Sequence, residues 1–487
     1  MTNLSTPQSP SAPSSPVAPP PAAAGLRAGR SPLPVLMCGT FMIVLDFFIV
    51  NVALPSIQSR LHATAGATEW VVAGYGLTFA VFLITAGRLG DRYGRRKVFC
   101  AGLVLFVLAS ALCGLAPNAG VLVAARLAQG MGGALISPTV LAIIGVAYPG
   151  PARVRAITVY GMVMGLAAAG GQLLGGLAIA LNPLDLGWRI VFLVNVPVGL
   201  VTLAFTRRQI AESRAAHGVA LDLPGMALVT LALTALVLPL VNGTQLHWPT
   251  WTWVSLALVP VLACVLAGTA ARAARRGGAP LLDPALFRSR ALLAGLATQL
   301  AFWCGQASFF LVLALYLQLG LGLTALQAGL IFSVLAVSYL GASLRAPALT
   351  LRYGRSLITT GAVALAAGEG VLLLTAGLLH GDGAVAALWL LPGLIPAGAG
   401  MGLAITPLTT IVLAHVDPPR AGALAGTLST MQQVGNAVGV AVTGVIFFGS
   451  VHAGYAWAFR LSMVQLAGLL LAVAVLSRLL PAKLARP

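Results

Sequence analysis

The segment GRLGDRYGRRKVF, residues 87–99, concentrates charge in a chain that is otherwise strongly apolar. Its thirteen residues include six charged side chains, whereas the whole chain of 487 residues has only 28 basic and 10 acidic residues. Hydrophobic residues make up 59% of the chain and charged residues 8%, against roughly 25% charged residues in a soluble domain. Because so few polar groups cannot cover a globular surface in water, the composition predicts a membrane protein.

Apolar runs long enough to cross a bilayer recur along the chain, and we expect each to be a helix because irregular backbone at membrane depth is costly. The Ser/Pro/Ala-rich residues 1–32 precede them and indicate a disordered tail. The first run lacks a following signal-cleavage pattern, so we interpret it as a retained helix. The fourteen expected spans are 33–55, 68–86, 98–116, 119–146, 156–180, 188–206, 223–243, 249–270, 293–318, 324–344, 356–379, 385–413, 420–449 and 456–480.

The basic residues predict the orientation of these spans. With both tails in the cytoplasm, 24 of the 28 basic residues lie on the cytoplasmic side, while Arg60, Arg189 and Arg460 lie outside and Arg126 lies within a span. Adding or removing one span would destroy this positive-inside asymmetry. The net charge of +18 is therefore explained by membrane orientation, and we expect no nucleic-acid partner. The excess of arginine over lysine, with abundant Ala and Gly, indicates a bacterial protein, so the expected location is the inner membrane.

Two short repeats predict an internal duplication. RYGR at 92–95 recurs at 352–355, and GQLLG at 171–175 has an echo, GNAVG, at 435–439. Both pairs hold the same register within six spans, and repeated halves that enclose a midplane site are typical of secondary transporters. The predicted organisation is a tail (1–32), an N-terminal six-helix half (33–207), two extra helices with linkers (208–292), a C-terminal six-helix half (293–480) and a short cytoplasmic tail (481–487).

Three motifs carry a family resemblance. Residues 87–97 resemble the signature loop of the major facilitator superfamily, G-x-L-x-D-R-x-G-R-R/K, and RLAQG at 126–130 resembles its R-x-x-Q-G element. LDFFIVNVALP at 45–55, with fourteen spans, is similar to the fourteen-helix drug/proton antiporters of the EmrB/QacA type. The resemblance implies an all-α major facilitator fold that expels amphipathic drugs by alternating access in exchange for protons.

The span 156–180 departs from the pattern of this group, which usually reads G-P-x-x-G-G where this chain has GQLLGG at 171–176. Gln172 cannot kink a helix as proline would, so no bend is expected from this position. The small residues still permit close contact between helices. The expected packing set is Gly165, Gly171, Gln172, Gly175 and Gly176.

Three ionisable residues are expected well inside spans, namely Asp46, Arg126 and Glu369, and such residues are functional candidates by default. At about 1.5 Å per residue, Asp46 lies roughly 20 Å from the cytoplasmic end of its helix and Arg126 roughly 10 Å from the outer end of its own. In a core of about 30 Å the two lie at similar depth, so an ion pair is possible. We expect Asp46 to exchange a proton with Arg126 modulating it; the alternative is a static buried pair. Glu369 either binds a cationic substrate, carries a second proton or hydrogen-bonds while neutral.

The resemblance implies that the loop between the spans 68–86 and 98–116 is a cytoplasmic gate. Its residues are Gly87, Asp91, Arg92, Gly94, Arg95 and Arg96. Asp91 is expected to bond, in one conformation, to the positive end of the helix that begins near 417–420. Leu351 stands at the corresponding place in the second copy, so such a latch would be asymmetric. The alternative is a basic loop that serves only to orient the protein.

Weaker signals complete the prediction. Trp70 and Tyr75, near the outer end of the span 68–86, are expected to anchor it at the membrane interface. Nothing resembles a nucleotide-binding loop, a nucleophile motif or a metal-ligand spacing, so we predict a non-enzymatic protein without cofactor or metal, driven by a proton gradient. Asn51, Gln129, Gln306 and Gln433 are candidates for lining the substrate cavity, although bonding between helices explains such residues equally well.

The expected partners are an amphipathic small-molecule substrate, protons and the lipid bilayer, and the chain is expected to act as a monomer. Two other functions stay open from the sequence. One is an exporter dedicated to a single metabolite, such as an antibiotic made by its own cell. The other is a membrane sensor built on a transporter scaffold, although such sensors usually append a long soluble domain, and this chain has short tails.

Overall fold

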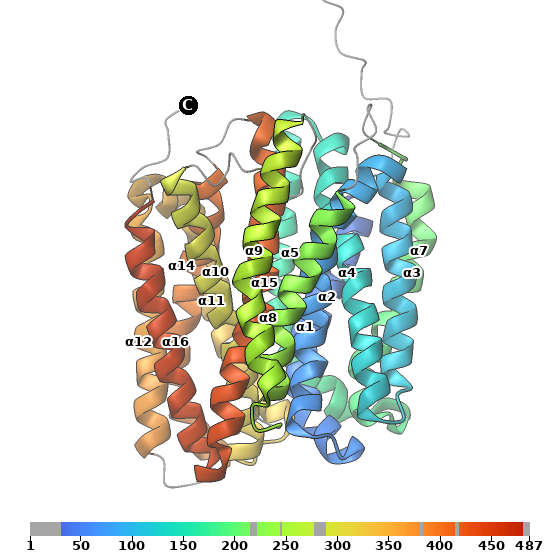
Figure 1. Cartoon of the computed structure of the whole chain (residues 1–487). Coiled ribbons are helices and arrows are strands. Elements are labelled where there is room, and N and C mark those ends of the chain that lie inside the picture. Colours follow the sequence, from blue (N-terminus) through green and yellow to red (C-terminus); the bar gives the residue numbers. More distant parts are fainter. Residues whose placement is uncertain are drawn as a thin grey trace, which may run out of the picture.

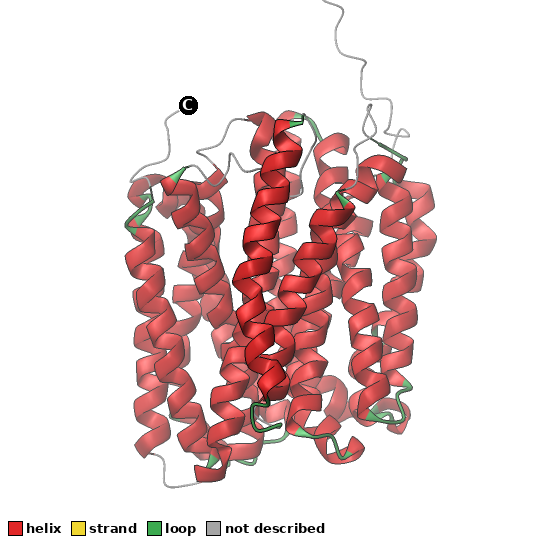
Figure 2. Cartoon of the chain, in the orientation of Figure 1, coloured by secondary structure: helices red, strands yellow, loops and turns green. Residues whose placement is uncertain are grey.

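The structure, a computed structural model, describes residues 31–214, 222–243, 246–276, 289–378, 383–413 and 418–480. Within these ranges the chain is built from helices joined by short connections, without strands (Figure 2). In the described part of the chain, thirteen helices are long and apolar enough to cross a membrane, and a bent helix makes the fourteenth. The predicted all-α class and the predicted number of spans are therefore confirmed.

The first group of helices packs around α4, which lies against α2 and α3, while α1 lies against α5. A 3-10 turn (Gly187–Arg189), α6 and α7 follow one another and form one span, Gly187–Gln209. The bounds in this group are α1 (Leu33–Leu61), α2 (Ala65–Tyr93), α3 (Arg95–Gly114), α4 (Ala119–Ala147), α5 (Gly150–Leu181), α6 (Ile190–Leu193) and α7 (Asn195–Gln209).

The second group packs around α14, which lies against α11 and α12, while α10 lies against α15 and α12 against α16. The predicted span 385–413 is wrong in one respect, because a turn at Trp389 and Leu390 separates α13 from α14. Pro392 then stands in the first turn of α14, where proline favours the start of a helix. The bounds are α10 (Arg290–Leu315), α11 (Ala325–Tyr353), α12 (Ser356–Leu378), α13 (Ala384–Leu388), α14 (Leu391–Leu413), α15 (Pro418–Ser450) and α16 (Tyr455–Ser477).

Two further helices, α8 (Leu223–Gly243) and α9 (Thr250–Arg275), pack against each other between the groups in sequence. α8 also contacts α2 of the first group and α15 of the second, and Figure 1 shows the pair in front of the seam between the groups. On α2, Trp70 Nε1 donates to Asn242 Oδ1 of α8 over 3.3 Å. The extra pair therefore covers the α2–α15 seam, with α9 largely exposed.

The bundle has two sides, which we name by the chain ends. α1 begins and α16 ends on the terminal side, at the top of Figure 1, and the opposite side is the distal side. α5 contacts α11, and α2 contacts α15, across the seam. At the distal end of α5 a methyl group on Gly176 would meet the carbonyl of Ala325, and nearer the middle the rings of Phe48 and Phe310 lie 4.9 Å apart. The groups are thus closed together on the distal side.

α5 bends by 44° between Arg155–Ala168 and Gly170–Leu181. The bend forms although α5 lacks the proline of the G-P-x-x-G-G pattern described above. The bend precedes Gln172 and falls directly before the consecutive glycines 170 and 171, a local weakness that permits a sharp kink. Beyond the bend, a methyl group on Gly171 would come within 3.1 Å of Phe48 Cβ on α1. Glycine therefore supplies both the bend and the close approach of α5 to α1. The rest of the packing set also lies at helix contacts: Gly175 faces α1, while Gly165, Gln172 and Gly176 face α11.

Candidate functional site

Asp46 and Arg126 form an ion pair inside the first group of helices. Asp46 lies in the middle of α1 and Arg126 lies in α4, and both side chains are 0% exposed. Arg126 Nη1 donates to Asp46 Oδ2. The ion pair between Asp46 and Arg126, which their similar depth made possible, is therefore present.

Two amides complete the bonding of the Asp46 carboxylate. Gln129, one turn after Arg126, donates from Nε2 to Asp46 Oδ1 over 2.9 Å, and Asn195 at the start of α7 donates from Nδ2 to the same oxygen over 2.7 Å. Both amides also donate to Ser110 Oγ of α3, over 2.6 Å and 3.3 Å. We call Asp46, Ser110, Arg126, Gln129 and Asn195 the Asp46 network; it joins α1, α3, α4 and α7.

Arg126 is held from several directions. Its Nε donates to the Val71 carbonyl of α2 over 2.8 Å, and its Cζ lies 4.3 Å from the ring centroid of Tyr75, a cation–π contact. The Tyr75 hydroxyl donates to the Ile43 carbonyl over 3.2 Å. Tyr75 is only 1% exposed, so its predicted role as an interfacial anchor is wrong. The ring is buried because it covers the guanidinium and its hydroxyl finds a backbone acceptor on α1.

The geometry of this network suits a carboxyl group that changes its protonation when helices move. Donors and a neighbouring cation favour an ionised carboxylate, and their withdrawal favours proton binding. The three donors to Asp46 come from α4 and α7, whereas the carboxylate is on α1. A shift of α1 against α4 and α7 would thus change the number of donors.

The other predicted intramembrane acid lies apart from this network. Glu369 is buried in α12, in the second group, and its Oε2 has no hydrogen-bond partner among the described residues. The sequence missed a further acid, Glu69, which is buried in the first turns of α2 against Gly444 of α15. Its Oε1 also lacks a partner within the described chain. The apolar run that follows Glu69 is the signal that could have identified it as an acid inside a span.

The four candidate cavity residues are dispersed. Gln129 is fully buried in the Asp46 network, where its amide bridges Asp46 and Ser110, and its place in a substrate cavity stays a prediction. Asn51 and Gln306 are buried, and Gln433 is half-buried and accepts from Asn436 Nδ2 over 3.4 Å.

Asp91, in the predicted gate loop, pairs with an arginine of the same loop. Asp91 accepts from Arg95 Nε and Nη2 over 3.1 Å and 2.7 Å. Gly94 has a φ of 110°, which favours glycine, and the Glu212 carboxylate lies against it. Glu212 Oε1 accepts from the Arg96 backbone N–H over 3.1 Å, a contact that the sequence did not indicate. Asp417, near the expected partner of Asp91, lies outside the described residues, so the latch stays a prediction.

In the second copy of the loop, Arg355, which corresponds to Arg95, binds backbone carbonyl groups. Gly354 again has a positive φ, 57°, as expected for a repeated turn. Arg355 Nη1 donates to the carbonyl oxygens of Arg478, over 2.7 Å, and Leu480. In the first copy Arg96 Nη1 donates to the Ile210 carbonyl over 3.2 Å. In each group an arginine of the repeated loop therefore binds the chain that follows the last helix.

Comparison with known proteins agrees with this architecture. The protein named "Probable actinorhodin transporter" of Streptomyces coelicolor is 39% identical over 435 residues, which cover 88% of this chain and 74% of that protein. The "Multidrug resistance protein Stp" of Mycobacterium tuberculosis is 34% identical over 410 residues, which cover 84% and 74%.

A solved structure of a POT family transporter in complex with 5-aminolevulinic acid shares the fold, with a TM-score of 0.67 at 15% identity, over 92% of this chain and 96% of that one. The family profile described as Major Facilitator Superfamily matches residues 36–440. The match spans α1 to α15 and so includes the Asp46 network and both copies of the arginine loop. This chain therefore belongs to the Major Facilitator Superfamily.

Proposed function

We propose that this protein is an efflux transporter that expels amphipathic small molecules in exchange for protons. The names of its relatives, an antibiotic transporter and a multidrug resistance protein, support export as the activity. The two packed groups of helices on either side of a seam support alternating access. The family membership supports a transporter rather than an enzyme.

The observation that carries proton exchange is the Asp46 network. A carboxylate and a guanidinium that are both removed from water are costly unless they are bonded, so an intramembrane pair of this kind is a candidate for function. In the distal-closed state Asp46 is ionised and bonded to Arg126, Gln129 and Asn195. In the opposite state α1 moves away from these donors and Asp46 takes up a proton. Return to the first state releases the proton, which couples the gradient to the rocking of the groups.

The charge distribution supports a cytoplasmic terminal side. Of the 28 basic residues, 24 lie on that side by sequence, and the positive-inside rule assigns such an excess to the cytoplasm. Closure on the distal side then corresponds to a state that admits substrate from the cytoplasm or the inner leaflet. Protonation from the outside would accompany release of the substrate.

Efflux from cells tests this proposal. Cells that lack their own exporters and express this protein are expected to accumulate less of a fluorescent lipophilic cation than control cells. A protonophore should abolish the difference, because the energy comes from the proton gradient. Equal accumulation with and without the protein over a panel of cationic and neutral amphipathic drugs would refute export. Export that survives the protonophore would refute proton exchange.

A second candidate is an exporter dedicated to one metabolite, such as an antibiotic made by the same cell. It is favoured by the relative whose name specifies a single antibiotic, actinorhodin. The breadth of resistance separates the two. A dedicated exporter protects cells against one chemical class, whereas a multidrug transporter protects against several unrelated drugs.

A further inference from the structure

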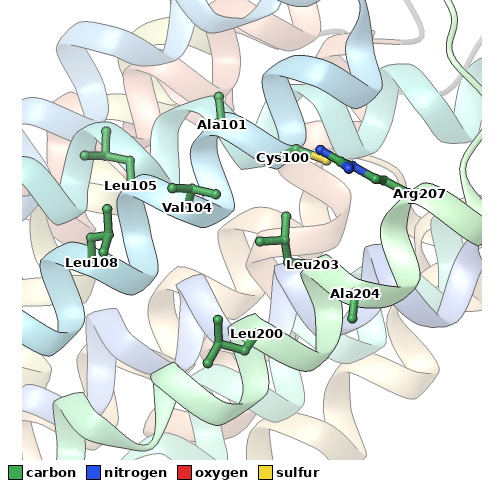
Figure 3. Close-up of a pocket in the computed structure, with 9 residues that line it drawn as sticks. All are labelled: Cys100, Ala101, Val104, Leu105, Leu108, Leu200, Leu203, Ala204 and Arg207. Carbon is green, nitrogen blue, oxygen red and sulfur yellow. The ribbon is translucent and has the colours of Figure 1, made fainter.

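An apolar groove of about 680 Å³ lies between α3 and α7, apart from the Asp46 network. Two helical stripes face each other across it (Figure 3). A volume of this size is in the usual range of ligand sites, roughly 300–1,000 Å³. The stripes consist of Cys100, Ala101, Val104, Leu105 and Leu108 on α3 and of Leu200, Leu203, Ala204 and Arg207 on α7.

The packing of α3 and α7 explains why the groove forms where it does. Toward the distal side the helices touch closely, since a methyl group on Gly199 would collide with Val107. Toward the terminal side the small side chains of Ala101 and Ala204 line the space between the helices. The side chains that remain along the walls are aliphatic, and Leu200 and Leu108 are exposed at 53% and 59%. The groove is therefore open to the hydrocarbon of the bilayer.

One cation marks the terminal end of the groove. Arg207 extends across the groove toward Cys100 (Figure 3), and the positive charges of Arg96 and Arg207 and the negative charge of Glu212 all act on the Cys100 thiol. Arg96 is engaged by the Glu212 carboxylate and the Ile210 carbonyl. Arg207 makes no ion pair with any carboxylate of the described residues. Its guanidinium is thus available to a ligand at the level of the lipid headgroups.

We propose that this groove binds an anionic phospholipid, with one acyl chain between the aliphatic stripes and the phosphate on Arg207. The eight helical steps from Cys100 to Leu108 give the groove a length of about 12 Å, enough for the upper part of an acyl chain. Guanidinium groups bind phosphate by paired hydrogen bonds, and basic residues on the cytoplasmic side attract anionic lipids. An amphipathic cation is repelled by the same charge. This lipid site is separate from efflux and does not depend on it.

Native mass spectrometry of the full chain tests the site. The protein is released from micelles that hold equal amounts of phosphatidylglycerol and phosphatidylcholine, and the lipids it retains are counted. Wild type is expected to retain phosphatidylglycerol preferentially. Arg207→Gln should reduce this preference roughly fivefold, the contribution of one basic residue near the surface. Arg208→Gln is the matched control, because it removes an adjacent exposed charge that does not line the groove.

A second variant tests the contribution of the acyl chain independently of that of the headgroup. Ala204→Phe fills the floor of the groove and should lower retention of both lipids while Arg207 remains. Equal retention by Arg207→Gln and Arg208→Gln would overturn the proposal, and so would full retention by Ala204→Phe. Displacement of phosphatidylglycerol by a lipophilic cation in wild type would also overturn it, because the groove would then be a drug site. If Ala204→Phe does not fold, the comparison of the two arginine variants still decides.

Discussion

The two groups of helices bury their carboxyl groups in different ways. In the first group, Asp46 receives hydrogen bonds from Arg126, Gln129 and Asn195 and leaves neither oxygen without a donor. In the second group, Glu369 is as deeply buried, yet one of its oxygens has no donor among the described residues. Asp46 and Glu369 are therefore equally buried but lie in two different electrostatic environments. A bonded carboxylate is stable as an ion, whereas an unbonded one is stable inside a membrane only as the neutral acid.

Arg126→Gln should have the largest effect, since it leaves the buried Asp46 carboxylate without its cation, with only the amides of Gln129 and Asn195 as donors. Removal of one partner of a buried pair is expected to destabilise the protein by about 3–5 kcal/mol. The midpoint of thermal unfolding in detergent measures this loss. The double variant Asp46→Asn/Arg126→Gln should recover much of the stability, because no charge is then left unpaired. An unfolding midpoint unchanged in Arg126→Gln would mean that the pair does not stabilise the fold.

Gly444→Ala examines Glu69, which lies at the seam and has one carboxyl oxygen without a partner among the described residues. The added methyl group would overlap the Glu69 carboxyl group, and such overpacking is expected to cost about 1–3 kcal/mol in the distal-closed state. A cysteine at Ala73, one turn from Glu69, should then react several-fold faster with a membrane-impermeant maleimide. Glu69→Ala in the same chain makes room for the methyl group and should restore slow labelling. Slow labelling in Gly444→Ala itself would contradict close packing at this point.

Asn195→Ala weakens the bonded environment without removing the cation. Asp46 keeps two donors, so the expected loss of stability is about 1–2 kcal/mol. The pH at which transport is half-maximal should shift as well, because one donor to the ionised carboxylate is gone. Asn51→Ala is a matched control, since Asn51 is buried on α1 and its Oδ1 has no partner in the described chain. A pH profile that moves equally in both variants would exclude a specific role for Asn195.

Glu369→Gln should have the smallest effect on stability. The substitution keeps the size of the side chain, and if Glu369 is neutral it replaces one neutral group by another, so the expected change is under about 1 kcal/mol. Asp46→Asn, the same chemical change in the bonded environment, should cost more. Thermal unfolding of the two variants side by side measures the difference. A loss in Glu369→Gln as large as that in Arg126→Gln would show that Glu369 is ionised and paired.

Much of this comparison was accessible from the sequence. Helix number follows from apolar length, and the meeting of Asp46 with Arg126 follows from the rise per residue along two antiparallel spans. Asn195 and Ser110 were not predicted, because the face that α7 or α3 turns inward depends on packing that hydropathy does not encode. Tyr75 was misassigned because an aromatic residue near a helix end suits the interface as well as a buried guanidinium.

Changes of backbone direction were also not predicted from the sequence. The bend in α5 follows Ala168, in a run of small apolar residues that predicts helix on either side. The turn at 389–390 lies within an apolar stretch that hydropathy assigns to a single span. The length of an apolar segment predicts that it crosses the membrane. It does not predict bends or turns within the membrane.

The central claim, that Asp46 couples protons to export, is tested most directly by transport into proteoliposomes under an imposed pH gradient. Wild type and Asp46→Asn are compared with the same lipophilic cation, with and without the gradient. Wild type should accumulate the cation only when the gradient is present. Asp46→Asn should bind the cation but show no accumulation driven by the gradient. Full gradient-driven accumulation by Asp46→Asn would contradict the account and leave the Asp46 network a static support of the fold.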